Sequence, residues 1–380
     1  MIETFARRNF ARGFSLLELM VAMGISLMLL LGVVALFVSS RASYETTERL
    51  SRIQENGRYA LDQMMSDLRY AGFQGCARAS QSKYRAMDYA ITTLNTPTAL
   101  TWNVLEALRG YQGTGENSFL PALDTTSFSP LPSGLGDVLV LRMARRDAKP
   151  LFTTQDQTDS LQDVVVAPVN PMPLAVGDIA MVSDCDARAW FQVTGIAGGA
   201  LQHAVVAASS RTVGTGDDAV TVQSAGNSQN GSTNPVIADI KHPFKKGAQV
   251  VPFETVVYYL APSTANPTQL SLWRKSGGAS PSDEIAEGIE RLELQFGSDA
   301  PGGAGGTQFV DASAVTNWDA VDSVQIALLA RAPDAYGNDI ERQQYVLFNS
   351  PVSVTAGPFN DRFQRKVFTA TVAVRNKIID

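Results

Sequence analysis

The sequence predicts an α+β fold in which a long N-terminal helix packs on an antiparallel β-sheet that carries an inserted β-rich region. Three observations lead to this prediction. Residues 19–38 contain no charged side chain and are rich in leucine, methionine and valine. Apolar residues then recur at alternating spacings of three and four as far as residue 71, which is typical of one helix face. Beyond Gly72 the apolar runs are short and many alternate with period two, as strands do.

The composition excludes several classes of protein. The 380-residue chain has a formal net charge of −6 and 45% hydrophobic residues, which suits a globular protein with one membrane segment. No basic block occurs outside the N-terminus, so nucleic-acid binding has no electrostatic basis. The sequence motifs of nucleotide-binding loops, zinc proteases, redox cysteine pairs and serine hydrolases are missing. We therefore expect no enzymatic activity, no cofactor and no metal ion.

The N-terminus has the features of a membrane-spanning segment preceded by a short basic leader. Residues 1–13 carry three arginines and one glutamate, a net charge of +2. At a rise of about 1.5 Å per residue, residues 19–38 are long enough for the roughly 30 Å hydrocarbon core of a bilayer. Because basic flanks stay in the cytoplasm, the N-terminus is predicted to be cytoplasmic and the remainder to lie across the membrane.

Three other interpretations of this segment fit less well. A cleavable secretory signal has a shorter apolar core and a small-residue cleavage site, which Ser39-Ser40-Arg41 matches poorly. Arg7-Arg8 resembles a twin-arginine signal only superficially, given the positions of Arg12 and Glu18. A plain signal anchor does not explain Glu18, because a carboxylate in an apolar span costs about 2.5–3.5 kcal/mol and is by default functional.

The run Gly13-Phe14-Ser15-Leu16-Leu17-Glu18, followed by an apolar helix, resembles the prepilin processing signature. The resemblance implies that a membrane-embedded prepilin peptidase cuts between Gly13 and Phe14, and that Phe14 is then N-methylated. The mature chain would begin at Phe14 with a net charge of −8, because 28 of the 31 basic and 36 of the 37 acidic residues remain.

A physical role for Glu18 follows from this implied cleavage. The new amine at Phe14 would lie at the edge of an apolar filament core, where the Glu18 carboxylate of a neighbouring subunit can pair with it. Pairing replaces two uncompensated charges in low dielectric by one compensated pair and fixes the axial register. Contact with lipid headgroups or with the subunit's own N-terminus is the alternative. Major pilins usually carry a proline within this helix, and none occurs between Phe14 and Ala71.

Past Arg41 the predicted helix becomes amphipathic. Its apolar stripe consists of Leu50, Ile53, Gly57, Ala60, Met64, Leu68 and Ala71. Opposite charges four residues apart cover the other faces in the pairs Glu45–Arg49, Glu48–Arg52 and Arg58–Asp62. Gly72 is a suitable stop. We expect one helix from about Phe14 to Ala71 that packs its second half on a globular domain; a separate coiled coil is the alternative.

The remaining chain is predicted to be rich in β-structure. Strands are expected over 137–144, 178–183, 189–195, 250–260, 269–274, 288–296, 321–330 and 366–375. The polar, glycine-rich stretches 209–235 and 297–306 are predicted to be loops. The expected plan is a leader (1–13), a transmembrane and assembly helix (14–40), an amphipathic helix (41–72) and a periplasmic β-rich domain (73–380).

The resemblance extends beyond the N-terminus. Residues 50–61, 67–76, 182–185, 190–194, 288–290 and 365–376 are similar to the PilW family of minor pilins. That family implies a low-abundance structural subunit, anchored in the inner membrane, that helps to prime pilus assembly and sits at or near the filament tip. Its implied partners are other minor pilins, the major pilin, the prepilin peptidase, the inner-membrane assembly platform and a tip adhesin. A minor pseudopilin of a type II secretion system and an unpolymerised, membrane-anchored binding module are the alternatives.

The two cysteines, Cys76 and Cys185, suggest one bridge in an oxidising periplasm. It would close a loop of about 110 residues, worth about 4–5 kcal/mol on the loop-entropy model. Two free buried thiols are the alternative, and the family resemblance supports the disulfide. His203 and His242 have no second ligand nearby in the sequence and are expected to be structural or exposed. Neither Asp217-Asp218 nor the stretch 299–311 has the ligand spacing of a calcium loop.

Overall fold

A computed structural model describes residues 15–73, 75, 90–94, 100–159, 162–184, 186–205, 209–213, 220–224, 227, 242–277, 281–299, 307–335, 340–349, 353–374 and 376. The chain divides into two compact units, Met1–Arg52 and Ile53–Asp380. The helix α1 (Leu16–Tyr70) contributes residues to both units.

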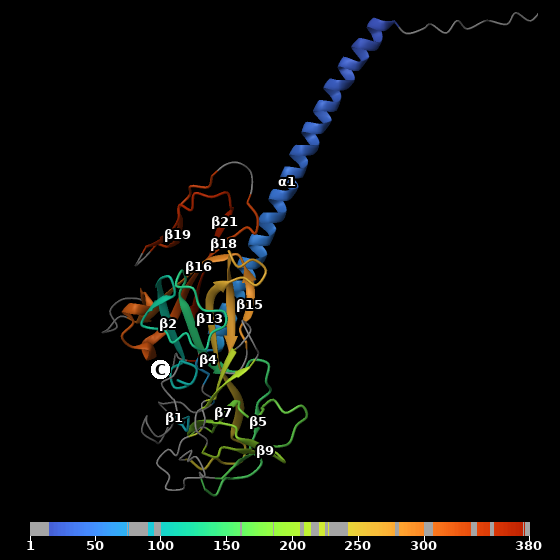
Figure 1. The fold of residues 1–380 in the computed structure, drawn as a ribbon. Helices are drawn as coiled ribbons and strands as arrows, with labels where there is room; N and C mark the ends of the chain where they lie inside the picture. The colour runs from blue at the N-terminus through green and yellow to red at the C-terminus, as the bar shows by residue number, and fades with distance from the viewer. Residues whose placement is uncertain are drawn as a thin grey trace, which may run out of the picture. The chain divides into compact units, whose positions relative to one another are not determined.

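The helix α1 is continuous over 55 residues and confirms the predicted long helix (blue in Figure 1). Two predicted pairs form on its surface, Glu45–Arg49 at 3.6 Å and Glu48–Arg52 at 2.8 Å. The third predicted pair, Arg58–Asp62, is not among the ion pairs of the described residues. The helix ends as predicted, because Gly72 adopts a φ of +75° and donates its N–H to the carbonyl of Arg142 at 2.9 Å.

The second unit is built from strands. They are β1 (Ala90–Thr92), β2 (Leu108–Gly115), β3 (Ser118–Leu120), β4 (Val138–Ala144), β5 (Leu151–Phe152), β6 (Val164–Val165), β7 (Ile179–Ser183), β8 (Arg188–Gln192), β9 (Gly195–Ala197), β10 (Ala200–Gln202), β11 (Ser209–Val213), β12 (Val220–Ser224), β13 (Gln249–Pro262), β14 (Leu270–Ser276), β15 (Asp283–Glu287), β16 (Ile289–Asp299), β17 (Thr307–Val310), β18 (Val321–Arg331), β19 (Tyr345–Phe348), β20 (Val354–Ala356) and β21 (Arg365–Ala373). Short 3₁₀ turns cover Ala312–Ala314 and Trp318–Ala320.

Two sheets dominate this unit. The larger has the order β1-β8-β7-β13-β4-β2-β3, with β14, β15 and β5 attached through β13. The second has the order β17-β16-β18-β21, and its last three strands lie side by side at the orange-to-red end of the chain (Figure 1). Apart from β1 with β8, every strand pair among the described residues is antiparallel. The predicted α+β class is therefore confirmed.

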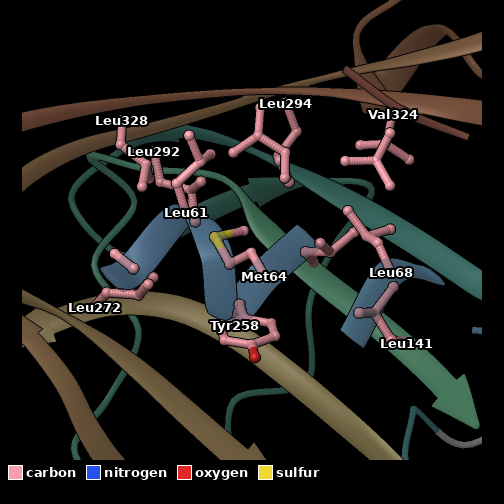
Figure 2. Close-up of a cluster of buried hydrophobic side chains, with 14 of the residues drawn as sticks. Leu61, Met64, Leu68, Leu141, Tyr258, Leu272, Leu292, Leu294, Val324 and Leu328 are labelled. Atoms are coloured by element: carbon pink, nitrogen blue, oxygen red, sulfur yellow. The ribbon is translucent and has the colours of Figure 1, made fainter. Parts of the chain in front are cut away.

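The second half of α1 lies between these two sheets and forms the centre of the main core. Figure 2 shows Leu61, Met64 and Leu68 of the helix in the middle of this cluster. On one side lie side chains from β16 and β18, namely Leu292, Leu294, Val324 and Leu328; on the other lie Leu141, Tyr258 and Leu272 from β4, β13 and β14. The predicted apolar stripe is buried from Ile53 to Ala71, and only Leu50 is an exception, being 40% exposed.

A buried carboxylate on the helix is hydrogen-bonded to the larger sheet and its neighbouring loop. Asp67 is fully buried, and its Oδ2 accepts hydrogen bonds from the Tyr258 hydroxyl at 2.6 Å and from Arg274 Nε at 2.9 Å. Its Oδ1 accepts a hydrogen bond from Arg146 Nη1 at 2.9 Å. Burial and the charge of Asp67 raise the pKa of Tyr258, so this phenol remains a donor. These contacts fix the rotation of α1 about its axis, since only one face can present the carboxylate to three donors.

The strand predictions agree with β4, β7, β8, β13, β14, β16, β18 and β21. The loop prediction over 209–235 is wrong where β11 and β12 form a hairpin, and β16 continues three residues into the predicted loop 297–306. These segments are polar or glycine-containing, so their apolar alternation is weak.

β2 was not predicted because it holds three glycines, yet a Cβ at Gly110 would lie 2.3 Å from the Phe296 ring. That glycine allows close packing; it does not mark a turn.

We predict that Asp67→Asn lowers the free energy of unfolding by about 3 kcal/mol or more, because it removes the buried carboxylate that pairs with Arg146 and Arg274 and leaves Arg274 with the more distant carboxylate of Glu254, at 3.8 Å. Asp62→Asn, an exposed acid on the same helix, is the control and should change stability by less than about 0.5 kcal/mol. Urea unfolding of the full chain in detergent, followed by tryptophan fluorescence, measures both. Equal effects of the two substitutions would contradict the role given to Asp67.

Candidate functional site

The start of α1 places Glu18 in a defined position. The described residues begin at Ser15; Gly13 and Phe14 lie outside them. The Ser15 hydroxyl accepts the N–H of Glu18 at 3.1 Å, and the Ser15 carbonyl accepts the N–H of Leu19 at 3.1 Å. Ser15 therefore caps the helix in the spacing of a capping box, with Glu18 as its fourth residue. The first turn is where the helix dipole favours an acidic side chain.

The surface around Glu18 is apolar and uncovered. The most apolar stretch of α1 is not buried, and by its length and composition the helix could cross a membrane. Leu16, Met28 and Leu36 are each more than 70% exposed. An isolated apolar rod of this size is unfavourable in water. Glu18 is thus a single carboxylate one turn into a surface that fits a bilayer or a bundle of similar helices.

Two family models match this chain. A model described as type IV pilus-assembly protein W matches residues 257–376, and a model of the prokaryotic N-terminal methylation motif matches residues 8–34. Residues 257–376 are therefore similar to PilW-family type IV pilins. The methylation motif covers the predicted cleavage position and Glu18, and the PilW match begins within β13 and includes the whole β17-β16-β18-β21 sheet.

A search of solved structures finds a similar chain, a type IV-like pilin from Thermus thermophilus, at 17% sequence identity. The alignment covers 33% of this chain and 66% of that chain, slightly less than two thirds of its length, with a TM-score of 0.22. Similarity at that level bears on neither fold nor function. No curated protein sequence matches the chain.

The PilW-matching region closes the end of α1. The side-chain amide of Asn376, the last matched residue, lies 3.3 Å from each of the carbonyl oxygens of Arg69, Tyr70 and Ala71. These are among the carbonyls that a helix leaves without an internal partner at its C-terminus. The matched region therefore covers one face of the second half of α1 and also caps its C-terminus. Asn376 lies more than 300 residues after the end of the helix.

A second feature of the matched region is an ion-pair cluster around Arg365 that the sequence did not indicate. The Arg365 side chain is fully buried; its Nε lies 2.5 Å from Glu290 Oε2 and its Nη2 lies 2.5 Å from Asp361 Oδ2. Arg331 pairs with the other Glu290 oxygen at 3.0 Å. The hydrogen bond from Arg365 lowers the pKa of the Asp361 carboxyl. The cluster joins β16, β18 and β21.

A third set of charged groups lies where β4 meets β16. Buried Asp137 accepts hydrogen bonds from the N–H groups of Gly113 at 2.9 Å and Leu294 at 2.8 Å, so one carboxylate links β2 to β16. Burial and the charge of Glu293 raise the pKa of Asp137 well above its ordinary value. Burial likewise raises the pKa of Glu293 to about 7, with a smaller contribution from Asp311.

The two histidines occupy structural positions. His203 is buried with its Nε2 3.0 Å from the Gln162 carbonyl, and His242 Nε2 lies 2.9 Å from Asp184 Oδ2. Over the part of the chain that the structure describes, no group of three or more His, Cys, Asp or Glu side chains could hold a metal ion. The predicted bridge partners Cys76 and Cys185 lie outside that part.

We predict that Glu293 makes the protein less stable as the pH rises towards neutrality. Its pKa is 4.5 in the unfolded chain and about 7 in the folded one, so the folded state binds the proton more tightly between these values. The stabilisation is complete below about pH 4.5 and is lost as the pH rises through about 7. Its size is about 2–3 kcal/mol.

Glu293→Gln should reduce that pH dependence without abolishing it, because burial also raises the pKa of the neighbouring Asp137, which contributes a slope of the same sign. Glu287→Gln, at an exposed position in β15, should leave the slope unchanged. Urea unfolding of the full chain at pH 4.5, 5.5, 6.5 and 7.5 measures the slope. A slope in Glu293→Gln as steep as in the wild-type protein would contradict the contribution given to Glu293.

Proposed function

We propose that this chain is a minor pilin of a type IV pilus, a non-enzymatic structural subunit that helps to initiate pilus assembly at or near the filament tip. The observation that carries the proposal is that one family match lies at the start of α1 and the other lies in strands that pack on its second half. The methylation motif covers the exposed apolar start of α1, and the PilW match covers strands that enclose its other half. A pilus subunit needs both parts: an apolar helix that can move from the membrane into a filament, and a globular domain that folds outside the membrane.

Processing is the first step of this proposal. A prepilin peptidase would cut between Gly13 and Phe14 and leave Phe14 N-methylated, which the match over residues 8–34 supports. The cap at Ser15 supports it as well, because the helix already begins two residues after the cut and the new N-terminus need not unwind it.

Assembly is the second step. Glu18 lies at the one position on the apolar surface where a positive charge can be compensated. The amine of Phe14 in an adjacent subunit is the cation that a filament of such helices supplies. The expected neighbours are other minor pilins, the major pilin and a tip adhesin, reached through an inner-membrane assembly platform.

The proposed membrane topology of the chain follows from the positive charge of the leader. Residues 1–13 would remain cytoplasmic, 14–40 would span the inner membrane, and the amphipathic helix 41–72 and the domain 73–380 would lie in the periplasm. After assembly the subunit would form part of the extracellular pilus. Minor pseudopilins of type II secretion systems have the same leader and helix, and the match over residues 257–376 favours the pilus.

We further propose that Cys76 and Cys185 form a disulfide. The support comes from their described neighbours: Gly75 has a φ of +71°, and a Cβ built on it would lie 2.5 Å from the Cβ of Ser183. The chain segments that precede the two cysteines therefore touch, and a side chain at position 75 would prevent that approach. In the periplasm such a pair oxidises readily.

We predict that Glu18→Ala is processed normally but is recovered in sheared pili at about a tenth of the wild-type amount or less, since one partner of a buried ion pair is missing. Glu55→Ala, an exposed acid farther along α1, is the matched control and should assemble like wild type. Mass spectrometry of the mature N-terminus, which should be N-methylated Phe14 in all three proteins, separates assembly from processing.

Normal recovery of Glu18→Ala in pili would contradict the assembly role, and an intact Met1 in wild-type cells would contradict processing. Deleting the gene distinguishes the two kinds of filament. Loss of surface pili and twitching supports the pilus, whereas loss of protein secretion with normal pili supports the pseudopilus.

We also predict that Cys76→Ser and Cys185→Ser each lower the free energy of unfolding by about 2–5 kcal/mol, and that the double substitution costs no more than either single one. Unfolding with and without reductant measures this. The wild-type protein should lose the same stability on reduction, and additive single effects would indicate two separate thiols.

A further inference from the structure

The strand β21 is an edge strand with a free outer side. It is the last strand of the β17-β16-β18-β21 order and pairs with β18 from Ser323–Ala373 to Arg331–Arg365. Among the described residues no other strand pairs with it. An edge of this length presents a row of backbone donors and acceptors to which another strand can bind.

Two hydrogen bonds establish which residues of β21 face outwards. Val374 donates its N–H to Asp322 O at 2.7 Å, and Ala332 donates its N–H to Gln364 O at 2.8 Å. In an antiparallel pair, bonded and non-bonded positions alternate, so the even-numbered residues from 364 to 374 turn their N–H and C=O groups towards β18. The odd-numbered residues Val367, Thr369, Thr371 and Ala373 therefore turn theirs towards the outer edge.

A groove lies on the sheet face that these same residues share. It has a volume of about 440 Å³ and is lined by Thr369 and Thr371 of β21, Gln325 of β18, and Leu347, Phe348 and Asn349 at the end of β19. The β19–β20 hairpin covers the face farther along, where Val367 packs against Leu329 and Tyr345. The described end of β19 thus forms one wall of the groove, and Thr369 and Thr371 of β21 form another. Alternate side chains of an added strand would enter it.

The charge of this region indicates the kind of segment that fits. The described residues 362–374 contain three basic residues and no acidic one, in a chain whose net charge is −6. Arg365 is occupied by Glu290 and Asp361, whereas Lys366 is exposed at the start of β21 with its Nζ over the Phe368 ring. An acidic residue at the end of an added strand would be attracted there. The groove itself, with Leu347 and Phe348 beside two threonines and an asparagine, suits small or β-branched side chains.

We propose that β21 accepts an added β-strand from a partner polypeptide: an extended segment with small or β-branched side chains at alternate positions and acidic residues at its ends. Main-chain hydrogen bonds to Val367, Thr369, Thr371 and Ala373 provide affinity, and the groove and Lys366 provide selectivity. This site does not depend on the proposed role in pilus assembly, because it requires only the folded second unit.

The test uses the full chain in detergent and a fluorescein-labelled probe peptide of alternating valine and threonine with two glutamates at each end. Fluorescence anisotropy measures its binding. Thr371→Pro removes one outward N–H without removing a bond to β18, and proline is tolerated on strand edges. We expect it to weaken binding by about tenfold, whereas the matched control Thr371→Val should bind within about threefold of wild type.

A second probe keeps the protein unchanged. The same peptide with alternate backbone nitrogens methylated cannot donate to the edge, and it should bind at least about tenfold more weakly than the unmodified probe. If Thr371→Pro fails to fold, this comparison decides the matter. A probe with lysines in place of the glutamates should also bind more weakly.

Absence of binding by the acidic probe would overturn the proposal. So would binding that neither Thr371→Pro nor backbone methylation weakens, because the peptide would then occupy another surface. Equal binding of the acidic and basic probes would remove the role given to Lys366.

Discussion

The burial of the second half of α1 between two sheets is the interaction on which the globular unit depends. Ile53, Met64 and Leu68 are each 1% exposed or less, and side chains from the strands on either side pack in the same cluster (Figure 2). At about 1.5–3 kcal/mol for each large apolar side chain, the stripe supplies a substantial part of the hydrophobic stabilisation. Asp67 fixes the rotation of α1 about its axis. Hydrophobic contacts alone would tolerate rotation of the helix, whereas three hydrogen-bond donors to one carboxylate do not.

The same helix meets two different requirements along its length. From Leu16 to about Val38 it is apolar around its whole circumference and uncovered, which suits lipid or other helices. From Ile53 it is apolar on the buried side and carries Glu55, Arg58 and Asp62 towards solvent. Glu18 and Asp67 are both carboxylates on this helix. Asp67 has its partners within the chain, whereas the proposed partner of Glu18 belongs to a neighbouring subunit.

The region that matches PilW has a structural explanation. It supplies the second sheet, the Arg365 cluster that joins three of its strands, and the Asn376 amide that caps α1. Each of these connects parts of the chain that are distant in sequence. Its outermost strand, β21, pairs with β18 on one side, and among the described residues no strand pairs with its other side.

Local features of the sequence determined the helix, its stop at Gly72, its buried stripe and the strands with strong apolar alternation, because in each of them the chemistry repeats with the period of the backbone. They also determined the processing signature and the isolated charge at Glu18. Tertiary structure decided the rest. Gly110 lies in a strand because it must admit Phe296; Asp67, in an ordinary helical pattern, is fully buried because donors from β13, β14 and the segment after β4 converge on it. The partners in these contacts are about 80 to 200 residues apart in the chain, and no local pattern carries information about a side chain that only folding brings near.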